Sequence, residues 1–185
     1  AGAKELMMAG IEENIANEFI AARSGINPDA IMEWLAKENV SVLTVEDEKY
    51  PKLLKEIYDP PQLLNLKGAL AEEDEFALAV VGSRKFSSYG KMAAEKIVAD
   101  LARNHLTIVS GLALGIDALA HFAALNAGGR TIAVLGSGLD KQNIYPSANR
   151  YLADKIVGEG GALVSEFPLG MPALPHHFPQ RNRII

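Results

Sequence analysis

Residues 76–84, FALAVVGSR, form the stretch that decides the fold. The apolar run from Phe76 to Val81 is typical of a strand buried on both faces, and such strands occur mainly in parallel sheets covered by helices. The run stops at Gly82-Ser83-Arg84, where glycine permits a tight turn. Residues 89–104 then carry apolar side chains at helical spacing. The stretch therefore predicts the strand, turn and helix that open a Rossmann-like unit.

The same alternation continues along the rest of the chain. We expect strands at 106–109, 131–135 and 162–165, and helices at 116–127 and 149–158. Strands and helices that alternate every 25–30 residues or so indicate a doubly wound parallel sheet with right-handed crossovers. The predicted fold class is α/β, with a Rossmann-like sheet domain over residues 62–185.

Residues 1–61 differ and predict a small helical domain, similar to SAM or helix-hairpin domains. A helix is expected over 12–22. Asn27 is expected to cap a second helix, with Pro28 at its first position because proline has no N–H to leave unpaired there.

The second helix carries a stripe of three apolar side chains, Ile31, Trp34 and Leu35. Their helical spacing is interpreted as the core of the helical domain. The stiff segment Asp59-Pro60-Pro61 ends helical structure. It is the predicted boundary between the two domains.

Composition and charge exclude several classes of protein. With 49% hydrophobic and 22% charged residues, the chain is globular rather than disordered. The absence of cysteine excludes disulfides and thiolate sites and suits the cytoplasm, the predicted location. No apolar run is long enough for a spanning helix, and no signal peptide is predicted. The net charge of −5 is uneven: residues 1–61 carry six basic and twelve acidic side chains, whereas 76–185 carry eleven and seven. A basic surface is therefore expected only in the sheet domain.

Three predicted strands end in small residues, which should meet at one edge of the sheet. The turns are Gly82-Ser83-Arg84, Ser110-Gly111-Leu-Ala-Leu-Gly115 and Gly136-Ser-Gly138. Glycine lets backbone approach a ligand, and helix N-termini attract anions. We expect a phosphate-binding edge there. Asp117 opens the second helix and is expected to accept N–H groups of the loop before it.

Other kinds of site fit the sequence poorly. The G-x-G-x-x-G fingerprint and the Walker A lysine are both missing, which argues against dinucleotide and P-loop sites. Ser110, Asp117 and His121 superficially resemble a hydrolase set, but no nucleophile elbow surrounds the serine. His176 and His177 are adjacent and generally point in different directions, which disfavours a metal site. No cofactor and no catalytic residue is predicted.

The end of the chain places two guanidiniums around an amide, in Arg181-Asn182-Arg183. Arginine near a helix N-terminus is disfavoured by the helix dipole, so the placement suggests an anionic partner. The apolar pair Ile184-Ile185 reads like the opening of a further helix. We therefore expect the sheet domain to be incomplete at its C-terminus.

Taken together, the motifs resemble those of the DNA-processing protein A (DprA/Smf) family. They are Val81-Gly-Ser-Arg84, Ser110-Gly-Leu-Ala-Leu-Gly-Ile-Asp117 with Ala120-His121, Thr131-Ile-Ala-Val-Leu-Gly136 with Gly138-Leu-Asp140, Tyr145-Pro146 with Asn149, Ser165-Glu166-Phe-Pro168, and Phe178-Pro with Arg181-Asn-Arg-Ile-Ile185. Their order and spacing make the resemblance specific, although each motif alone is weak.

The resemblance implies a non-catalytic protein that binds single-stranded DNA. Such proteins protect incoming DNA in natural transformation and help to load the RecA recombinase, usually as homodimers. The residues expected at the DNA are Gly82, Ser83, Arg84, Lys85, Phe86, Ser110, Gly111, Gly115, Asp117, Gly136, Gly138, Lys141, Arg181, Asn182 and Arg183. A basic groove with aromatic faces is what single strands need, and Phe86 is the foremost candidate for stacking on a base.

An alternative comes from a different class of protein. Related Rossmann-like folds bind nucleotides or hydrolyse nucleoside monophosphates to ribose phosphate and free base. Those phosphoribohydrolases carry a P-G-G-x-G-T loop, whereas here Gly160-Gly161 is followed by Ala162-Leu163. The alternative stays open but has less support.

Overall fold

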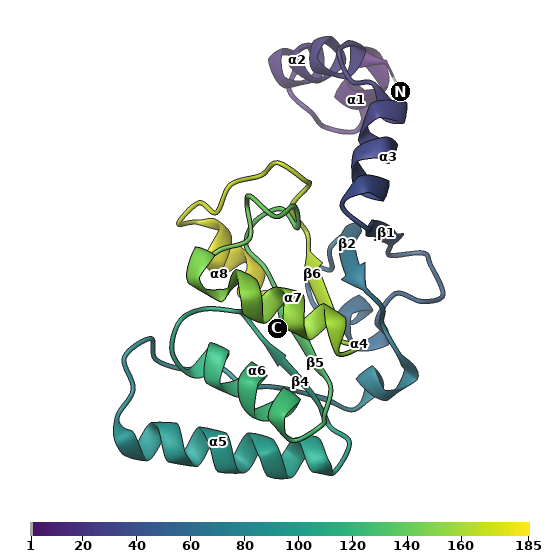
Figure 1. Ribbon diagram of the computed structural model, residues 1–185. Helices are drawn as coiled ribbons and strands as arrows, with labels where there is room; N and C mark the ends of the chain where they lie inside the picture. The colour runs from purple at the N-terminus through teal and green to yellow at the C-terminus, as the bar shows by residue number, and fades with distance from the viewer. Residues whose placement is uncertain (1) are drawn as a thin grey trace. The chain divides into compact units, whose positions relative to one another are not determined.

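The computed structural model describes residues 2–185, whose strands form one mixed sheet (Figure 1). The strands are β1 (Val40–Thr44), β2 (Leu63–Gly68), β3 (Ala77–Ala79), β4 (Thr107–Ser110), β5 (Thr131–Val134) and β6 (Ala162–Ser165), in the spatial order β1-β2-β6-β5-β4-β3. β3 to β6 are parallel, and β2 runs antiparallel to both β1 and β6. The predicted α/β class with a Rossmann-like sheet is confirmed, and the antiparallel edge is an addition to it.

Of the helices in the described residues, the first three precede the strands, the next four lie between strands in the chain, and the last follows β6. They are α1 (Ala3–Met8), α2 (Glu13–Ser24), α3 (Pro28–Lys37), α4 (Lys52–Lys55), α5 (Ser88–Arg103), α6 (Ile116–Asn126), α7 (Arg150–Gly158) and α8 (His177–Arg181). Three 3₁₀ turns accompany them, η1 (Glu72–Glu75), η2 (Ser147–Asn149) and η3 (Asn182–Ile184). None of the described helices is long and apolar enough to cross a membrane.

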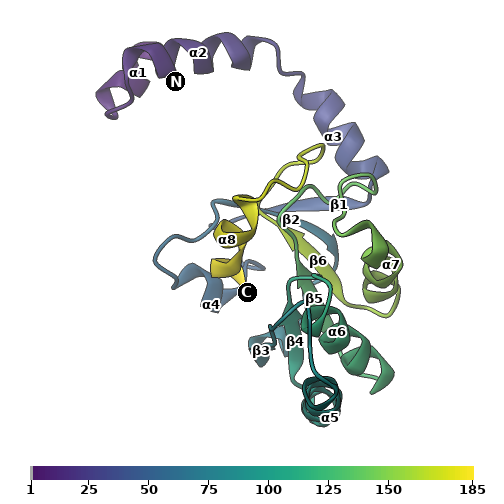
Figure 2. The ribbon, with the colours of Figure 1, turned by 90° about the vertical axis from the view of Figure 1, so that its left-hand side faces the viewer.

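The crossover helices share one face of the sheet. Because β3 to β6 are neighbours in chain order, right-handed crossovers place α5, α6 and α7 on the same side. Figure 2 shows α6 and α7 on one side of the sheet, and α4 and α8 on the other. The second face is therefore covered by the short helices α4 and α8 and not by helices that connect parallel strands (Figure 2).

Small side chains on α6 let α5 pack closely beside it. Ala120, Ala123 and Ala124 are buried in one cluster with Val98 of α5. The helix α5 begins where Ser87 caps it, since the Ser87 hydroxyl accepts a hydrogen bond from the N–H of Gly90 at 3.1 Å.

The boundary between the two units lies before residue 35, upstream of the expected boundary at Asp59-Pro60-Pro61. The contacts separate residues 1–34 from 35–185, because β1 pairs with β2 along its whole length. The hydroxyl of Tyr50 also donates to the carbonyl of Pro61 at 2.8 Å. Residues 35–61, expected in the helical domain, are therefore part of the sheet unit.

The N-terminal unit contains the predicted helices but little core. Asn27 caps α3 as predicted, since its side-chain oxygen accepts from the N–H groups of Asp29 and Ala30. However, Ile31 is 45% and Trp34 41% exposed. Leu35 is buried in a cluster of the sheet unit instead. The interpretation of this stripe as a helical core was wrong, because its last member packs beside the sheet.

Candidate nucleic-acid interface

Four loops meet at the edge where the parallel strands end. They are residues 80–87 after β3, 111–115 after β4, 135–146 after β5 and 166–176 after β6. Parallel strands direct all their carboxyl ends to one edge, which is where open α/β sheets usually bind ligands. The residues of all three predicted glycine turns lie in or next to these loops.

The first two loops touch through their glycines. Gly115 has φ +95°, and a Cβ there would lie closer than 3.0 Å to the backbone of Ser83 and Arg84. A Cβ on Gly82 would lie 2.8 Å from the side chain of Ile116. The N–H of Ile116 donates to the carbonyl of Ser83 at 3.2 Å. Both glycines are therefore needed for packing of protein against protein, independently of any ligand.

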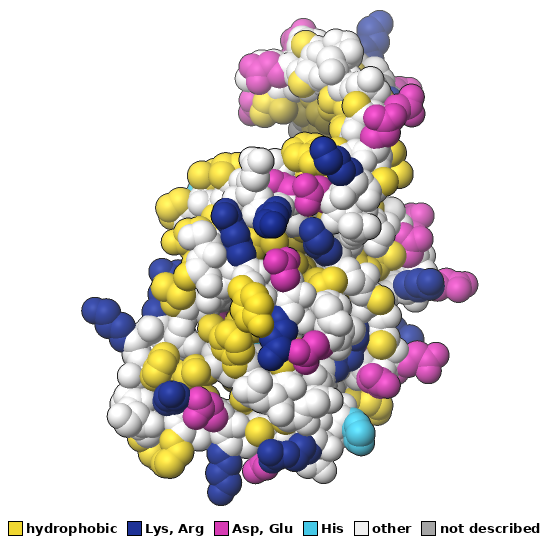
Figure 3. Space-filling view, viewed as in Figure 1, with side chains coloured by type: hydrophobic (Ala, Val, Ile, Leu, Met, Phe, Trp, Pro, Cys, Tyr) yellow, Lys and Arg dark blue, Asp and Glu magenta, His cyan; other side chains and the backbone are white. Residues whose placement is uncertain are grey.

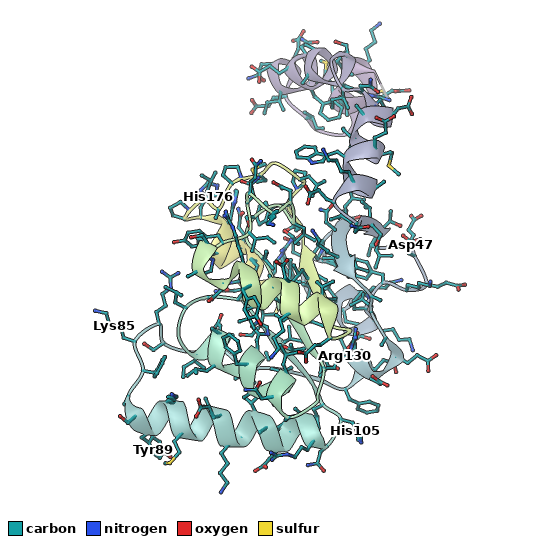
Figure 4. The ribbon with its side chains drawn as sticks, viewed as in Figure 1. Asp47, Lys85, Tyr89, His105, Arg130 and His176 are labelled. Carbon is teal, nitrogen blue, oxygen red and sulfur yellow. The ribbon has the colours of Figure 1, made fainter. Side chains whose placement is uncertain are left out.

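The loop after β3 presents two cations to solvent. Ser83 closes a local turn, because its hydroxyl donates to the carbonyl of Lys85 and accepts from the Lys85 N–H. Arg84 and Lys85 are exposed, and neither forms an ion pair within residues 2–185. Figure 4 shows Lys85 pointing away from the protein. Phe86 beside them is 42% exposed, so an aromatic face lies next to two free positive charges.

The loop after β4 is held by side chains from other elements. Asp117 accepts from the N–H of Gly111 at 3.2 Å, as predicted. Asn149 donates to the carbonyl of Leu112 at 2.8 Å, and Ser110 donates to the carbonyl of Val80 at 2.6 Å. The N–H groups of Ala113 to Gly115 donate no hydrogen bond within the described chain. They remain available to an anion.

Arg181 lies beneath this edge and is only 5% exposed. Its Nη1 donates to the carbonyls of Gly111, at 2.8 Å, and of Val134. Burial lowers its pKa; nearby Asp117 opposes this effect and Arg84 adds to it. Arg181, expected among the residues at the DNA, is placed by the structure in α8, where its side chain donates to backbone carbonyls at the ends of two strands.

Arg183 is occupied by carboxylates. Both oxygens of Glu166 accept from its terminal nitrogens, at 2.9 and 2.6 Å, and Asp59 accepts from Nε at 3.1 Å. The hydrogen bond to Glu166 is the main cause that raises the pKa of Arg183. Asn182 is exposed, and its side-chain oxygen accepts from Arg181. Arg183 is thus an ion-paired residue rather than a free cation at the edge.

The loop after β5 is also filled by protein. A Cβ on Gly136 would lie 3.2 Å from the ring of Phe178, and one on Gly138 would lie 2.7 Å from the carbonyl of Pro168. Asp140 joins this loop to the next one by accepting from the N–H of Gly170 at 2.8 Å. Lys141, the next residue, is exposed. It is the third cation at this edge without an ion pair in the described residues.

An aromatic pair joins the loop after β5 to α8. The rings of Tyr145 and Phe178 are 5.7 Å apart between centroids and tilted by 47°. Tyr145 is 50% exposed, so one of its faces is open to solvent. On the face drawn in Figure 3, basic side chains are spread among acidic and apolar ones rather than forming one continuous surface.

The superficial hydrolase set is not assembled. Ser110 bonds to Val80, and His121 bonds to the hydroxyl of Thr131 at 2.7 Å. Buried His121 has its pKa lowered to about 3, chiefly by desolvation. No hydrogen bond joins Ser110, Asp117 and His121 within residues 2–185.

The histidine pair does not form a metal site either. The Nδ1 of His177 lies 3.2 Å from the carbonyl of Gly136, and its ring stacks on Phe167 at 4.0 Å. Among the described residues, no group of three or more His, Asp or Glu is placed to hold a metal ion. Two surface hollows lie away from this edge, one between α5 and α6 and one beside Gly128-Gly129 at the strand starts.

Sequence reasoning missed the residues that hold the edge together. Asp140 joins the loop after β5 to the loop after β6, and Asn149, the last residue of η2, holds the loop after β4. The motifs that contain them predict neither role. Arg150 was not considered; it donates to the carbonyls of Ile144 and Gln142 and so shapes the loop after β5.

Comparison with known proteins relates the chain to one family. The family described as DNA recombination-mediator protein A matches residues 41–185. Protein Smf of Escherichia coli is 46% identical over 97% of this chain and 47% of its own length. DNA processing protein DprA of Streptococcus pneumoniae is 50% identical over 94% of this chain and 65% of its own length. The chain thus spans about half to two thirds of these relatives.

Solved structures agree with the sequence comparison. The crystal structure of DprA from Streptococcus pneumoniae superposes with a TM-score of 0.70 at 45% identity, covering 89% of this chain and 61% of that one. A structure of DNA processing protein A from Helicobacter pylori, described for its single-stranded DNA binding mode, gives 0.68 at 30% identity over 79% and 64%. The chain belongs to the DNA recombination-mediator protein A family, the family of DprA and Smf.

Proposed function

We propose that this chain binds single-stranded DNA along the edge formed by its strand-end loops, as part of a DNA-processing protein that acts in recombination. The observation that carries the proposal is that Arg84, Lys85 and Lys141 are exposed and without ion pairs in the loops of this edge, where the N–H groups of residues 113–115 have no hydrogen-bond partner in the described chain. The Helicobacter pylori relative, described as binding single-stranded DNA, supports it.

The chemistry of the edge matches a flexible polyanion. Exposed cations and backbone N–H groups bind phosphates without reading bases. Phe86 and Tyr145 offer open aromatic faces in the same loops as the cations, and stacking on such faces tolerates any base. The glycines and Ser110 contribute by packing the loops, while Asp117, Arg181 and Asn182 support them from below or beside.

The wider role follows the family. We infer that the whole protein protects incoming single strands, helps to load a RecA-type recombinase, acts as a homodimer in the cytoplasm and is not an enzyme. Asn182 and Arg183 have a smaller part in the proposed contact surface than the sequence suggested, since Arg183 is held by Glu166 and Asp59.

A titration tests the central proposal. Labelled oligothymidylate is titrated with the chain by fluorescence anisotropy at several salt concentrations, with duplex of equal length as competitor. We expect affinity to fall steeply with salt and duplex to compete poorly, since no element is shaped for a groove. Salt-independent binding would contradict the proposal. Release of free base from nucleoside monophosphates, assayed on the same preparation, would support the phosphoribohydrolase alternative instead.

A further inference from the structure

Gly111, at the start of the loop after β4, is held from two sides by charged side chains. Asp117 accepts from its N–H at 3.2 Å, and Arg181 donates to its carbonyl at 2.8 Å. Both side chains are buried, at 5% exposure each. A buried charged side chain that hydrogen-bonds to a backbone N–H or carbonyl strongly limits the movement of that peptide group.

Arg181 also joins two strand ends. The nitrogen Nη1 that bonds Gly111 bonds the carbonyl of Val134, the last residue of β5. A Cβ on Gly111 would fall on the guanidinium, so this position admits no side chain while Arg181 is in place. The C-terminal helix α8 therefore reaches under the loop and fixes it to the neighbouring strand.

The restricted loop is the one that offers free donors. Leu112 follows Gly111 with φ +58°, an uncommon conformation for a residue with a branched side chain, which surrounding contacts must maintain. Asn149 bonds its carbonyl. Ala113 to Gly115, which come next, have N–H groups without partners in the described chain. Their direction depends on how Gly111 and Leu112 are held.

We propose that Arg181 is a positioning residue of the DNA-binding edge, acting through Gly111 rather than by touching phosphate. The inference rests on the proposed function. The second terminal nitrogen of Arg181, Nη2, has no hydrogen-bond partner within residues 2–185, so a direct contact with phosphate is also conceivable on geometric grounds. The experiment must therefore separate positioning from direct contact.

The variant Arg181→Lys keeps the charge and removes the guanidinium fork. Arg130→Lys is the control: Arg130 is also largely buried and bonds the carbonyls of Gly160 and Ala69, in addition to the carboxylate of Asp74, but it precedes β5 at the opposite edge (Figure 4). We expect Arg181→Lys to weaken oligothymidylate binding about tenfold. Arg130→Lys should change it less than about twofold, because the hydrogen bonds that it disturbs lie at the other edge of the sheet.

Two further readouts on Arg181→Lys and Arg181→Met decide the mechanism. Positioning predicts that amide exchange at residues 111–115 accelerates without DNA, and that the dependence of log affinity on log salt is unchanged in Arg181→Met. Loss of a phosphate contact would reduce that slope by about 0.7. A reduced slope, unchanged exchange, or equal affinity losses at Arg181 and Arg130 would each overturn the proposal.

Asp117→Asn tests the other side of the clamp and serves if the Arg181 variants do not fold. Removing a negative charge near bound phosphate should by itself strengthen binding. Positioning predicts the opposite sign, a loss of roughly fivefold, because the hydrogen bond to Gly111 weakens. Tighter binding by Asp117→Asn would overturn the inference. Failure of the wild-type chain to bind DNA would refute the proposed function, whereas the exchange measurement would still report on the clamp.

Discussion

The three arginines expected at the DNA, Arg84, Arg181 and Arg183, have three different environments. Arg84 is exposed on a loop, Arg181 is buried among carbonyls and Arg183 lies between two carboxylates. Desolvation and pairing remove a cation from the surface even when its sequence motif suggests a ligand. Of the three, Arg84 is therefore the one available to a phosphate in solvent.

Arg84→Ala should weaken single-stranded DNA binding by about 1–3 kcal/mol, the range for removal of a charge-assisted hydrogen bond. Lys91→Ala is the control, since Lys91 lies on α5 and is placed 3.8 Å from Glu95. It should have little effect. Anisotropy titrations of both folded variants compare them directly, and equal losses would remove Arg84 from the site.

Buried His121 should make stability depend on pH. Its pKa falls from the ordinary 6.5 to about 3 in the folded state, chiefly through burial and secondly through the charge of Arg181. Between these values the unfolded chain binds more protons than the folded one. The free energy of unfolding should therefore decrease as pH falls through this window, by up to about 1.4 kcal/mol per pH unit.

His121→Asn removes this titration and keeps a donor near Thr131. Urea unfolding between pH 7.5 and 5 should show a shallower pH dependence for the variant than for the wild type, whatever its stability at neutral pH. Parallel curves would mean that His121 is accessible to protons in the folded protein.

At the scale of elements, the edge is built by close approach of loops. The loops after β3 and β4 touch at Gly82 and Gly115, and the loops after β5 and β6 are joined by Asp140. These contacts leave cations on the outside and fill the inside with protein. The edge is consequently a loop surface rather than a closed pocket, which suits a polymer better than a small ligand.

Gly115→Ala should destabilise the sheet unit by more than Gly128→Ala. Both glycines have positive φ, +95° and +73°, but a Cβ at 115 would meet the backbone of Ser83 and Arg84, whereas none lies within 4 Å at 128. The backbone conformation alone costs an alanine about 1 kcal/mol. We expect a loss beyond that at Gly115, on the order of 2–4 kcal/mol by urea unfolding. Equal losses at both positions would mean that the two loops separate at little cost.

At the scale of the whole molecule, the acidic N-terminal unit and the sheet unit should have separate roles. Residues 1–34 carry two basic and six acidic side chains, which disfavours contact with phosphate. A chain reduced to residues 35–185 should bind oligothymidylate as tightly as the full chain, or slightly more tightly at low salt. A tenfold loss in that titration would assign part of the interface to the helices.

The alternation of apolar runs with helical stripes was enough to predict the parallel part of the sheet. The run 131–135 is buried throughout, as expected of a central parallel strand. The run 76–81 was also expected to be buried on both faces, and this was wrong: β3 lies at the edge of the sheet with a single neighbour, β4, and Leu78 and Val81 are 43% and 60% exposed. The alternation of strands and helices also predicted the shared edge at the carboxyl ends of the strands. The position of Asp117 at the start of a helix predicted that it accepts from an N–H of the preceding loop, as it does from Gly111. Local patterns sufficed there because each depends on residues a few positions apart.

The positions of residues 35–61 and of the charged side chains depend on contacts between residues that are far apart in the chain. Residues 40–44 were assigned to a helical domain because the antiparallel pairing that makes them a strand is with residues 63–67. Arg181 and Arg183 were expected at the DNA, but in the structure they bond to the carbonyl of Val134 and the carboxylate of Glu166, which lie 47 and 17 positions away in the chain. Local sequence patterns were therefore enough to predict the periodic elements and the edge that they share. Which cations stay exposed depends on distant partners, whose positions follow from how the sheet is paired and covered.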